Sequence, residues 1–317
     1  MSSLVNQPLP LIDIMHHPIE TFLKQANSII LGKEKTIKLA LACILAKGHL
    51  LIEDIPGVGK TTLAHTFATL LGLDFQRIQF TSDLLPADIV GSSVFDRDNN
   101  TFEFHSGPIF SNFILADEIN RATPKTQSAL LEAMEEHQVT IEKKTHPMTN
   151  PFIVMATQNP GYQVGTFPLP ESQLDRFLMR LSIGYPDTES EKKLLNGTNT
   201  RRQLESSKPV ISSDQLVSLQ QQVLDINAAE PLIAYVQALL EFSRSSPLFT
   251  QGLSPRAGIA LIQAAKAWAL IDGRDSVYPE DIQALLPSIT EHRLQLQNNV
   301  AANQGASSTL LNEVAIP

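Results

Sequence analysis

Residues 50–62 read LLIEDIPGVGKTT, an apolar run followed by a glycine-containing turn and a Gly-Lys-Thr motif. The helical pattern of residues 63–68 follows at once. A strand, a tight turn and a helix in this order direct backbone N–H groups and the positive end of the helix at one anion, and Lys60 adds a mobile charge. The segment therefore predicts a phosphate-binding loop.

The loop departs from the general pattern at one position, because Asp54 stands where a glycine is usual. This replacement removes a flexible hinge and places a carboxylate near the expected phosphate. The alternative interpretation is a glycine-rich turn with an incidental lysine, but the complete strand–loop–helix order favours nucleotide binding. We expect the nucleotide contacts from Asp54, Pro56, Gly57, Val58, Gly59, Lys60, Thr61 and Thr62.

A second segment, residues 113–118, consists of four apolar residues followed by Asp117 and Glu118. It predicts a buried parallel strand that ends at the ligand-binding edge of an open α/β sheet. Asp117 could hold Mg²⁺ together with the Thr61 hydroxyl, and Glu118 could orient or deprotonate an attacking water. Two solvated acids at a strand end are the alternative. The phosphate-binding loop upstream favours ATP hydrolysis.

Three further polar residues suit such a site. Asn159 ends another apolar strand and could bond the terminal phosphate or the water, although Asn-Pro is also a common turn. Arg176 could reach the γ-phosphate held by a neighbouring subunit. Arg256 follows Ser254-Pro255, a helix start, from which it could reach a phosphate. Taken singly, each arginine could instead form a surface ion pair, and only their order suggests a catalytic role.

The chain resembles the MoxR-type AAA+ ATPases from about residue 25 to 290. The resemblance is carried by the segments 53–61, 87–91, 102–104 with 107–108, 116–122, 156–160, 173–177 and 254–257. An acidic residue at position 54 is usual in that family. The resemblance implies that Lys60 and Thr61 are Walker A residues and that Asp117 and Glu118 are the Walker B pair. It also implies that Asn159 is sensor 1, Arg176 the trans-acting arginine finger and Arg256 sensor 2.

The composition fits a globular cytoplasmic enzyme. The net charge of −9 argues against a broad basic surface for nucleic acid. Cys43 is the single cysteine and lies in an apolar helical pattern, so we expect core packing. No secretory signal is evident, and no apolar run reaches the ~18 residues of a membrane span. We expect no metal other than Mg²⁺ brought with ATP.

We expect an α/β P-loop domain, a parallel sheet sandwiched by helices, followed by a small all-helical lid. The expected divisions are a flexible arm at 1–20, the AAA+ domain at 21–185, the lid at 188–293 and a frayed tail at 294–317. The hinge would lie at 184–187, and the lid would move as Arg256 responds to the nucleotide.

Two β-hairpins are also predicted. Aromatic residues alternate on either side of Asp98-Asn99-Asn100 between residues 94 and 104. In related ring ATPases a hairpin in this region faces the central pore, and exposure of Phe102 or Phe104 would support a partner contact there. The second hairpin would place one strand at 138–142 and a turn at 143–146, followed by the strand that ends at Asn159.

The sequence thus predicts an Mg²⁺-dependent ATPase that forms a homo-oligomeric ring and moves a bound protein partner. The resemblance implies a hexamer and a chaperone-like role in maturing other complexes, with von Willebrand factor A-domain proteins as possible clients. Two alternatives stay open at this point. One is an ATP-dependent conformational switch without remodelling, and the other is a nucleic-acid motor, against which the acidic charge argues.

Overall fold

The computed structural model describes residues 11–159, 165–197, 200–297 and 305–316. Its centre is a five-stranded sheet with the strand order β2-β5-β8-β1-β9, in which every pairing is parallel. These strands are β1 (Leu50–Glu53), β2 (Phe75–Gln79), β5 (Phe113–Asp117), β8 (Ile153–Gln158) and β9 (Met179–Leu181). The predicted α/β parallel sheet is confirmed.

The central strands are apolar along their whole length because helices cover both faces of the sheet. All residues of β5 are buried, as are those of β8 up to its last residue. Since the strands are parallel, their carboxyl ends meet at one edge, where Glu53 pairs with Gln158 and Gln79 pairs with Asp117. The phosphate-binding loop and the acidic pair therefore share this edge.

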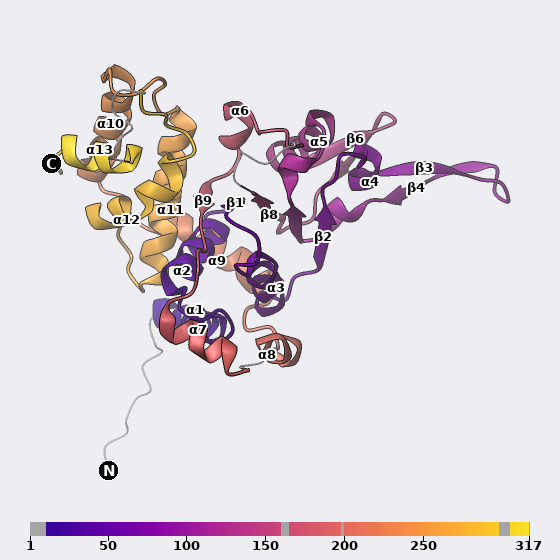
Figure 1. Ribbon diagram of the computed structural model, residues 1–317, viewed down its shortest axis with the longest axis horizontal. Coiled ribbons are helices and arrows are strands. Elements are labelled where there is room, and N and C mark those ends of the chain that lie inside the picture. Colours follow the sequence, from indigo (N-terminus) through magenta and orange to yellow (C-terminus); the bar gives the residue numbers. More distant parts are fainter. Residues whose placement is uncertain (1–10, 160–164, 198–199, 298–304, 317) are drawn as a thin grey trace, which may run out of the picture.

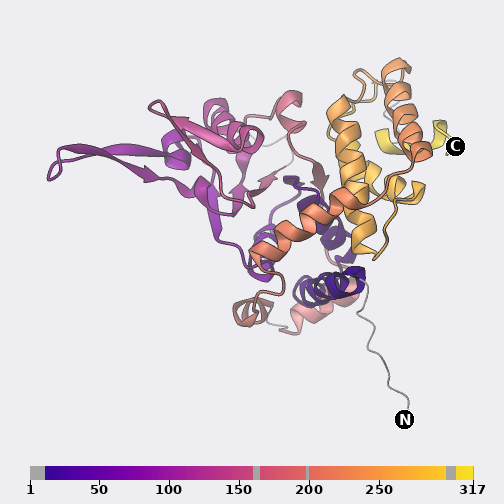
Figure 2. The same cartoon turned by 180° about the vertical axis from the view of Figure 1, so that it is seen from behind.

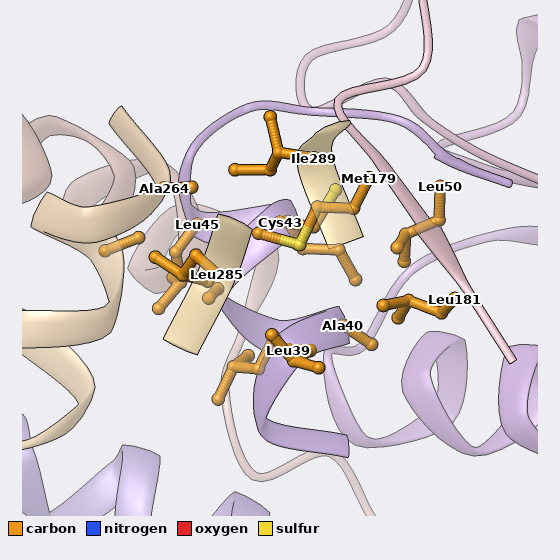
Figure 3. Packing of buried hydrophobic residues seen from close by; sticks show 14 of the residues in the cluster. Leu39, Ala40, Cys43, Leu45, Leu50, Met179, Leu181, Ala264, Leu285 and Ile289 are labelled. Atoms are coloured by element: carbon orange, nitrogen blue, oxygen red, sulfur yellow. The ribbon is translucent and has the colours of Figure 1, made fainter. Parts of the chain in front are cut away.

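Helix α2 (Glu34–Leu45) lies between the sheet and the helical half of the chain. Figure 3 shows Cys43 of α2 surrounded by Met179 of β9 and by Leu285 and Ile289. Burial raises the pKa of the Cys43 thiol far above its usual range, as expected for an inert core residue. Helix α1 (Leu11–Ile29) packs on α3 (Lys60–Leu70) through the edge-to-face contact of Phe22 with Phe67, 5.1 Å between ring centroids. One face of the sheet thus shares a core with the helical half of the chain, and the residues on the other face belong to a second cluster.

Helices dominate the chain from Thr188 onward, as predicted. They are α7 (Thr188–Leu195), α8 (Thr200–Ser206), α9 (Ser213–Asp225), α10 (Glu230–Ser245), α11 (Pro255–Ile271), α12 (Pro279–Thr290) and α13 (Ala306–Glu313). Helices α10 to α13 gather on one side of the molecule (Figure 1). Helix α9 instead crosses the body (Figure 2) and packs on α2, where Gln220 Nε2 donates to the Ile44 carbonyl over 2.9 Å. No helix among the described residues combines the length and apolar character needed to cross a membrane.

A helix is present in the described part of both the expected arm and the expected tail. Helix α1 begins at Leu11, inside the expected arm of residues 1–20, and Ile19 is fully buried. Within the expected frayed tail, α13 buries Leu310, and Glu291 accepts a hydrogen bond from the Ser307 N–H over 3.0 Å. The sequence interpretation missed this short helix because the tail is mostly polar. The apolar side of the helix packs on the core. Residues 1–10 and 298–304 lie outside the described residues.

The first predicted hairpin is confirmed, and the second is shifted. Strands β3 (Gly91–Asp96) and β4 (Thr101–Ser106) pair antiparallel and project from the body (Figure 1). The second hairpin pairs β6 (Gln138–Ile141) with β7 (Lys144–Pro147), so the predicted turn at 143–146 is wrong. Glu142 and Lys143 form the turn instead, both with positive φ, because two left-handed residues match the twist of a tight hairpin.

Three α-helices and two short 3₁₀ turns complete the described elements. They are α4 (Pro86–Val90), α5 (Pro124–Glu136), α6 (Glu171–Leu174) and the short 3₁₀ turns Pro108–Phe110 and Ile119–Arg121, which flank β5. Helix α5 carries the buried stripe of Leu130, Leu131 and Met134, which packs against the sheet. That stripe is core packing, as its helical spacing predicted.

Candidate functional site

The phosphate-binding loop lies at the carboxyl edge of the sheet, between β1 and α3. Gly57 and Gly59 have φ angles of +84° and +95°, a region that L side chains rarely adopt. Open space surrounds both positions, so backbone conformation is what requires glycine there. No described side chain caps α3, and its first residues are partly or fully exposed. The loop thus presents free donors and a helix N-terminus, as an anion site requires.

Lys60 reaches across the loop toward the acidic strand. Its Nζ donates to the Asp54 carbonyl over 2.6 Å and to Asn159 Oδ1 over 3.2 Å. Burial lowers the pKa of Lys60, against the attraction of three nearby carboxylates. The Lys60 ammonium is therefore already aimed at the space between the loop and the acidic strand.

The Asp54 carboxylate bonds both the start of the loop and the segment that follows β9. Its Oδ2 accepts hydrogen bonds from Ser182 Oγ, Ile183 N and Gly184 N, at 2.9, 2.6 and 2.7 Å, and its Oδ1 accepts from Ile55 N at 2.8 Å. Burial would raise the pKa of Asp54, but these donors hold it below its ordinary value. In this structure the Asp54 carboxylate thus ties the start of the loop to the end of β9, and its expected contact with phosphate stays a prediction.

Asp117 ends β5 with both carboxylate oxygens engaged. Thr157 Oγ1 donates to Oδ1 over 2.6 Å, and Arg77 donates to Oδ2 from Nη2 over 2.6 Å and from Nε over 3.1 Å. A carboxylate and a hydroxyl are hard oxygen donors, so Asp117 and Thr61 are residues of the kind that would hold Mg²⁺ together with water and phosphate oxygens. Binding of Mg²⁺ at Asp117 Oδ2 would have to displace Arg77.

Glu118 follows in the left-handed region, with φ of 56°, and its N–H donates to Thr157 Oγ1 over 2.9 Å. Asn159 Nδ2 donates to Glu118 Oε1 over 3.1 Å, so the expected base and the expected water-positioning amide are in direct contact. Arg121 Nε lies 2.9 Å from Oε2, and Gln79 Nε2 donates to the same oxygen over 3.3 Å. The chain itself therefore holds the Glu118 carboxylate from both sides.

Arg77, Gln79 and Thr157 were missed from the sequence. Arg77 and Gln79 lie two residues apart on β2, so their side chains share one face of the edge strand, next to the acidic end of β5. The two-residue spacing of Arg77 and Gln79 around the apolar Ile78 was a signal for this placement, but only the strand order shows which acid they meet.

Arg176 and Arg256 lie together, and away from the loop. Arg176 Nη2 and Arg256 Nη2 approach the two oxygens of Glu135 at 2.8 and 2.6 Å, and Arg176 Nη1 donates to the Leu131 carbonyl over 2.6 Å. Glu135, on α5, was not singled out in the sequence. The two arginines and this carboxylate line an open cavity of about 340 Å³.

This arginine cluster, defined as Glu135, Arg176 and Arg256, lies at the amino edge of the sheet. Its cavity is also lined by Gly48 and His49, which precede β1, whereas the loop follows β1. The Leu178 N–H donates to the His49 carbonyl over 2.9 Å, which fixes the amino end of β9 there. A four-residue strand spans about 13 Å. The structure thus does not bring Arg256 to the loop of its own chain.

The comparisons with known proteins agree with this architecture. Residues 49–179 match the model of the ATPase family associated with various cellular activities (AAA), and residues 241–314 match the AAA lid domain. Chaperone MoxR1 of Mycobacterium tuberculosis is 38% identical over 94% of this chain and 81% of its own length. The uncharacterized protein YeaC of Bacillus subtilis is 45% identical over 89% of this chain and 88% of its own.

A solved structure gives the same result. A crystal structure of a Cytophaga hutchinsonii protein, proposed to be an ATPase, superposes with a TM-score of 0.87 at 37% identity and covers 96% of this chain and 97% of its own. The matches to two AAA models and to MoxR proteins over most of the chain agree with the loop, the acidic pair and the helical lid. The chain therefore belongs to the MoxR family of AAA+ ATPases.

Proposed function

We propose that this protein is an Mg²⁺-dependent ATPase that works as a homo-oligomeric ring and remodels a protein client. One observation carries the proposal: the arginine cluster lies at the edge of the sheet opposite the phosphate-binding loop. Arg176 and Arg256 are then out of reach of the ATP bound by their own chain. A ring in which each chain offers its arginine cluster to the loop of its neighbour would complete the site.

In this proposal the loop N–H groups and Lys60 hold the phosphates, and Thr61 and Asp117 hold Mg²⁺. The metal, when bound, neutralises charge that develops on the phosphate oxygens. Lys60 is already close to both Asn159 and the acidic pair, so its ammonium needs little movement to reach a terminal phosphate.

Glu118 is the proposed base for the attacking water, and Asn159 positions that water. Three side chains now bond the Glu118 carboxylate, from Asn159, Arg121 and Gln79. Of these bonds one falls on Oε1 and two on Oε2, and each carboxylate oxygen can accept about two. Oε1, beside Asn159, is therefore the oxygen proposed to accept the proton from water.

The β3–β4 hairpin is the proposed client contact. Phe102 is 71% exposed, and Phe95, its cross-strand partner, lies 5.2 Å away between ring centroids. Phe104 instead packs on His146 of the second hairpin, at 4.3 Å. An exposed aromatic pair on a projecting hairpin supports contact with another chain. The name of the mycobacterial relative, a chaperone, supports a protein client.

The test is ATP turnover per chain as a function of protein concentration, for the wild type, Arg176→Ala and the control Arg97→Ala. Arg97 is an exposed arginine in the turn between β3 and β4, and it is not part of the arginine cluster. We expect turnover per chain to rise with concentration, and Arg176→Ala to bind ATP but hydrolyse it about 10³-fold more slowly. Turnover independent of both concentration and Arg176 would refute the shared site and favour a nucleotide switch.

A further inference from the structure

Arg293, just after α12, holds the segment of residues 175–178 that contains Arg176. Its Nε donates to Asp175 Oδ1 over 2.6 Å, and its Nη2 donates to the carbonyls of Phe177 and Asp175 over 2.7 and 3.2 Å. Its Nη1 donates to the Leu178 carbonyl over 3.2 Å and to the Ile289 carbonyl. The side chain is only 5% exposed. One guanidinium thus bonds the residues on both sides of Arg176.

The neighbouring His292 adds a second bond to the same segment. Its Nε2 donates to the Phe177 carbonyl over 3.0 Å. Burial and the adjacent Arg293 charge lower the pKa of His292 well below its ordinary value, so the ring is neutral and carries its proton on Nε2. Two consecutive residues that follow the last turn of α12 therefore anchor residues 175–178.

These contacts connect the helical half of the chain to the arginine cluster. Residues 175–178 form the short link between the end of α6 and the first residue of β9. Asp175 also accepts a hydrogen bond from Ser254 Oγ, the N-cap of α11, over 3.3 Å. The ends of both α11 and α12 thus meet at Asp175, next to Arg176.

We propose that Arg293 is a positioning residue for Arg176: it couples the position of α12 in one chain to the arginine that acts on the ATP of the neighbouring chain. This inference rests on the proposed shared site. Its physical basis is geometric. A planar guanidinium with five fixed donors can hold a carboxylate and several carbonyls at once, whereas an ammonium cannot reproduce that fork. Movement of α12 therefore moves the backbone that carries Arg176.

The experiment mixes two defective chains. Arg293→Lys keeps Glu118 but misplaces Arg176, and Glu118→Gln cannot hydrolyse ATP but keeps a correctly held Arg176. Alone, Arg293→Lys should lose about 10–100-fold in turnover, because misplacement of a catalytic group by 1 Å has effects of that size. Its affinity for a fluorescent ATP analogue should stay within about twofold, because its own loop is untouched.

In the mixture, Glu118→Gln chains supply intact arginine clusters to the sites of Arg293→Lys chains. Turnover per Arg293→Lys chain should therefore rise as Glu118→Gln is added. If Arg293→Lys only destabilised the helical lid, adding Glu118→Gln chains would not raise its turnover. If Arg293→Lys does not fold, Asp175→Asn replaces it, since this change removes the carboxylate side of the same contact. The mixture is then judged by the same criterion.

Two controls separate the possible results. Arg176→Ala mixed with Glu118→Gln tests the shared site alone and should be rescued in the same way. Arg274→Lys breaks a bidentate pair with Asp281 in the helical half, at 2.7 and 2.9 Å, without touching residues 175–178, and should keep its turnover. Rescue of Arg176→Ala but not of Arg293→Lys would overturn this inference. Failure of both would refute the shared site itself.

Discussion

The substitution Asp54→Asn tests whether the carboxylate in the phosphate-binding loop stabilises the fold or serves the nucleotide. One oxygen, Oδ2, accepts from three donors in residues 182–184, and the other accepts from the Ile55 N–H. Asp54 is 8% exposed, so water cannot readily replace these bonds. The side chain of asparagine fills the same space but has only one oxygen.

The expected cost follows from that missing acceptor. If the amide oxygen faces residues 182–184, its NH₂ group faces the Ile55 N–H and leaves that donor unpaired. An unpaired buried donor costs about 1–3 kcal/mol, and the loss of charge weakens the three remaining bonds. We therefore expect Asp54→Asn to lower the free energy of unfolding by about 2–4 kcal/mol.

Urea unfolding of the nucleotide-free protein measures this change. Asp88→Asn is the control, because Asp88 is an exposed carboxylate that accepts a single N–H bond, from Leu85 over 2.8 Å, and should shift the free energy of unfolding by less than about 0.5 kcal/mol. If Asp54→Asn is as stable as the wild type but binds nucleotide more weakly, the proposed structural role of Asp54 is refuted. Asp54 would then be a nucleotide-contact residue.

The difference in unfolding free energy between the wild type and Asp54→Asn should depend on pH, and its direction can be predicted. The pKa of Asp54 lies below its ordinary 3.8 in the folded chain, so the unfolded chain binds the proton more readily. The stabilisation is present above pH 3.8 and is lost as the pH falls through the lower folded value. The difference between wild type and Asp54→Asn should therefore shrink below pH 3.8.

Three further predictions concern other parts of the chain. Arg77→Gln should lower the Mg²⁺ concentration needed for binding of a fluorescent ATP analogue by up to about fivefold. The effect is small because Arg77 is 49% exposed and competes only weakly with Mg²⁺ for Asp117. A higher Mg²⁺ requirement in the variant would contradict this prediction. Burial lowers the pKa of His49 to about 4, so the unfolded chain binds the proton more readily between pH 6.5 and 4. The free energy of unfolding of the wild type should therefore fall by up to about 3 kcal/mol over that range. Urea titrations at several pH values should show a smaller fall for His49→Gln. Leu310→Ala should lower the free energy of unfolding by about 2–5 kcal/mol, because this α13 side chain is fully buried, and an unchanged thermal midpoint would show that α13 contributes nothing.

The nucleotide side of the site was predictable because its chemistry is local. The apolar strand, the two glycines and Lys60 are adjacent in sequence, and backbone conformation within a few residues arranges them. Asp117 and Glu118 could be placed by the same reasoning, since a buried parallel strand delivers whatever follows it to the carboxyl edge. The contact of Asn159 with Glu118 follows from the pairing of β5 and β8 at that edge.

The contacts that distinguish this molecule depend on packing between distant segments. Arg256 and Glu135 are 121 residues apart, and only the docking of α11 on the end of α5 brings them together. Residue type alone suggested that Asp54 faces phosphate, but the direction of its side chain depends on where β9 ends beside β1. Arg77 meets Asp117 because β2 pairs with β5, which its own sequence does not specify.

The sequence by itself determined the α/β class, the phosphate-binding loop, the acidic pair and the helical second half, because each depends on periodicity and chemistry within a few neighbouring residues. Only the tertiary structure decided which acid Arg77 meets, which way Asp54 faces and where the arginines lie. Those outcomes depend on strand order and on helix docking between residues 40 to 130 positions apart in the sequence, so a short motif cannot specify them.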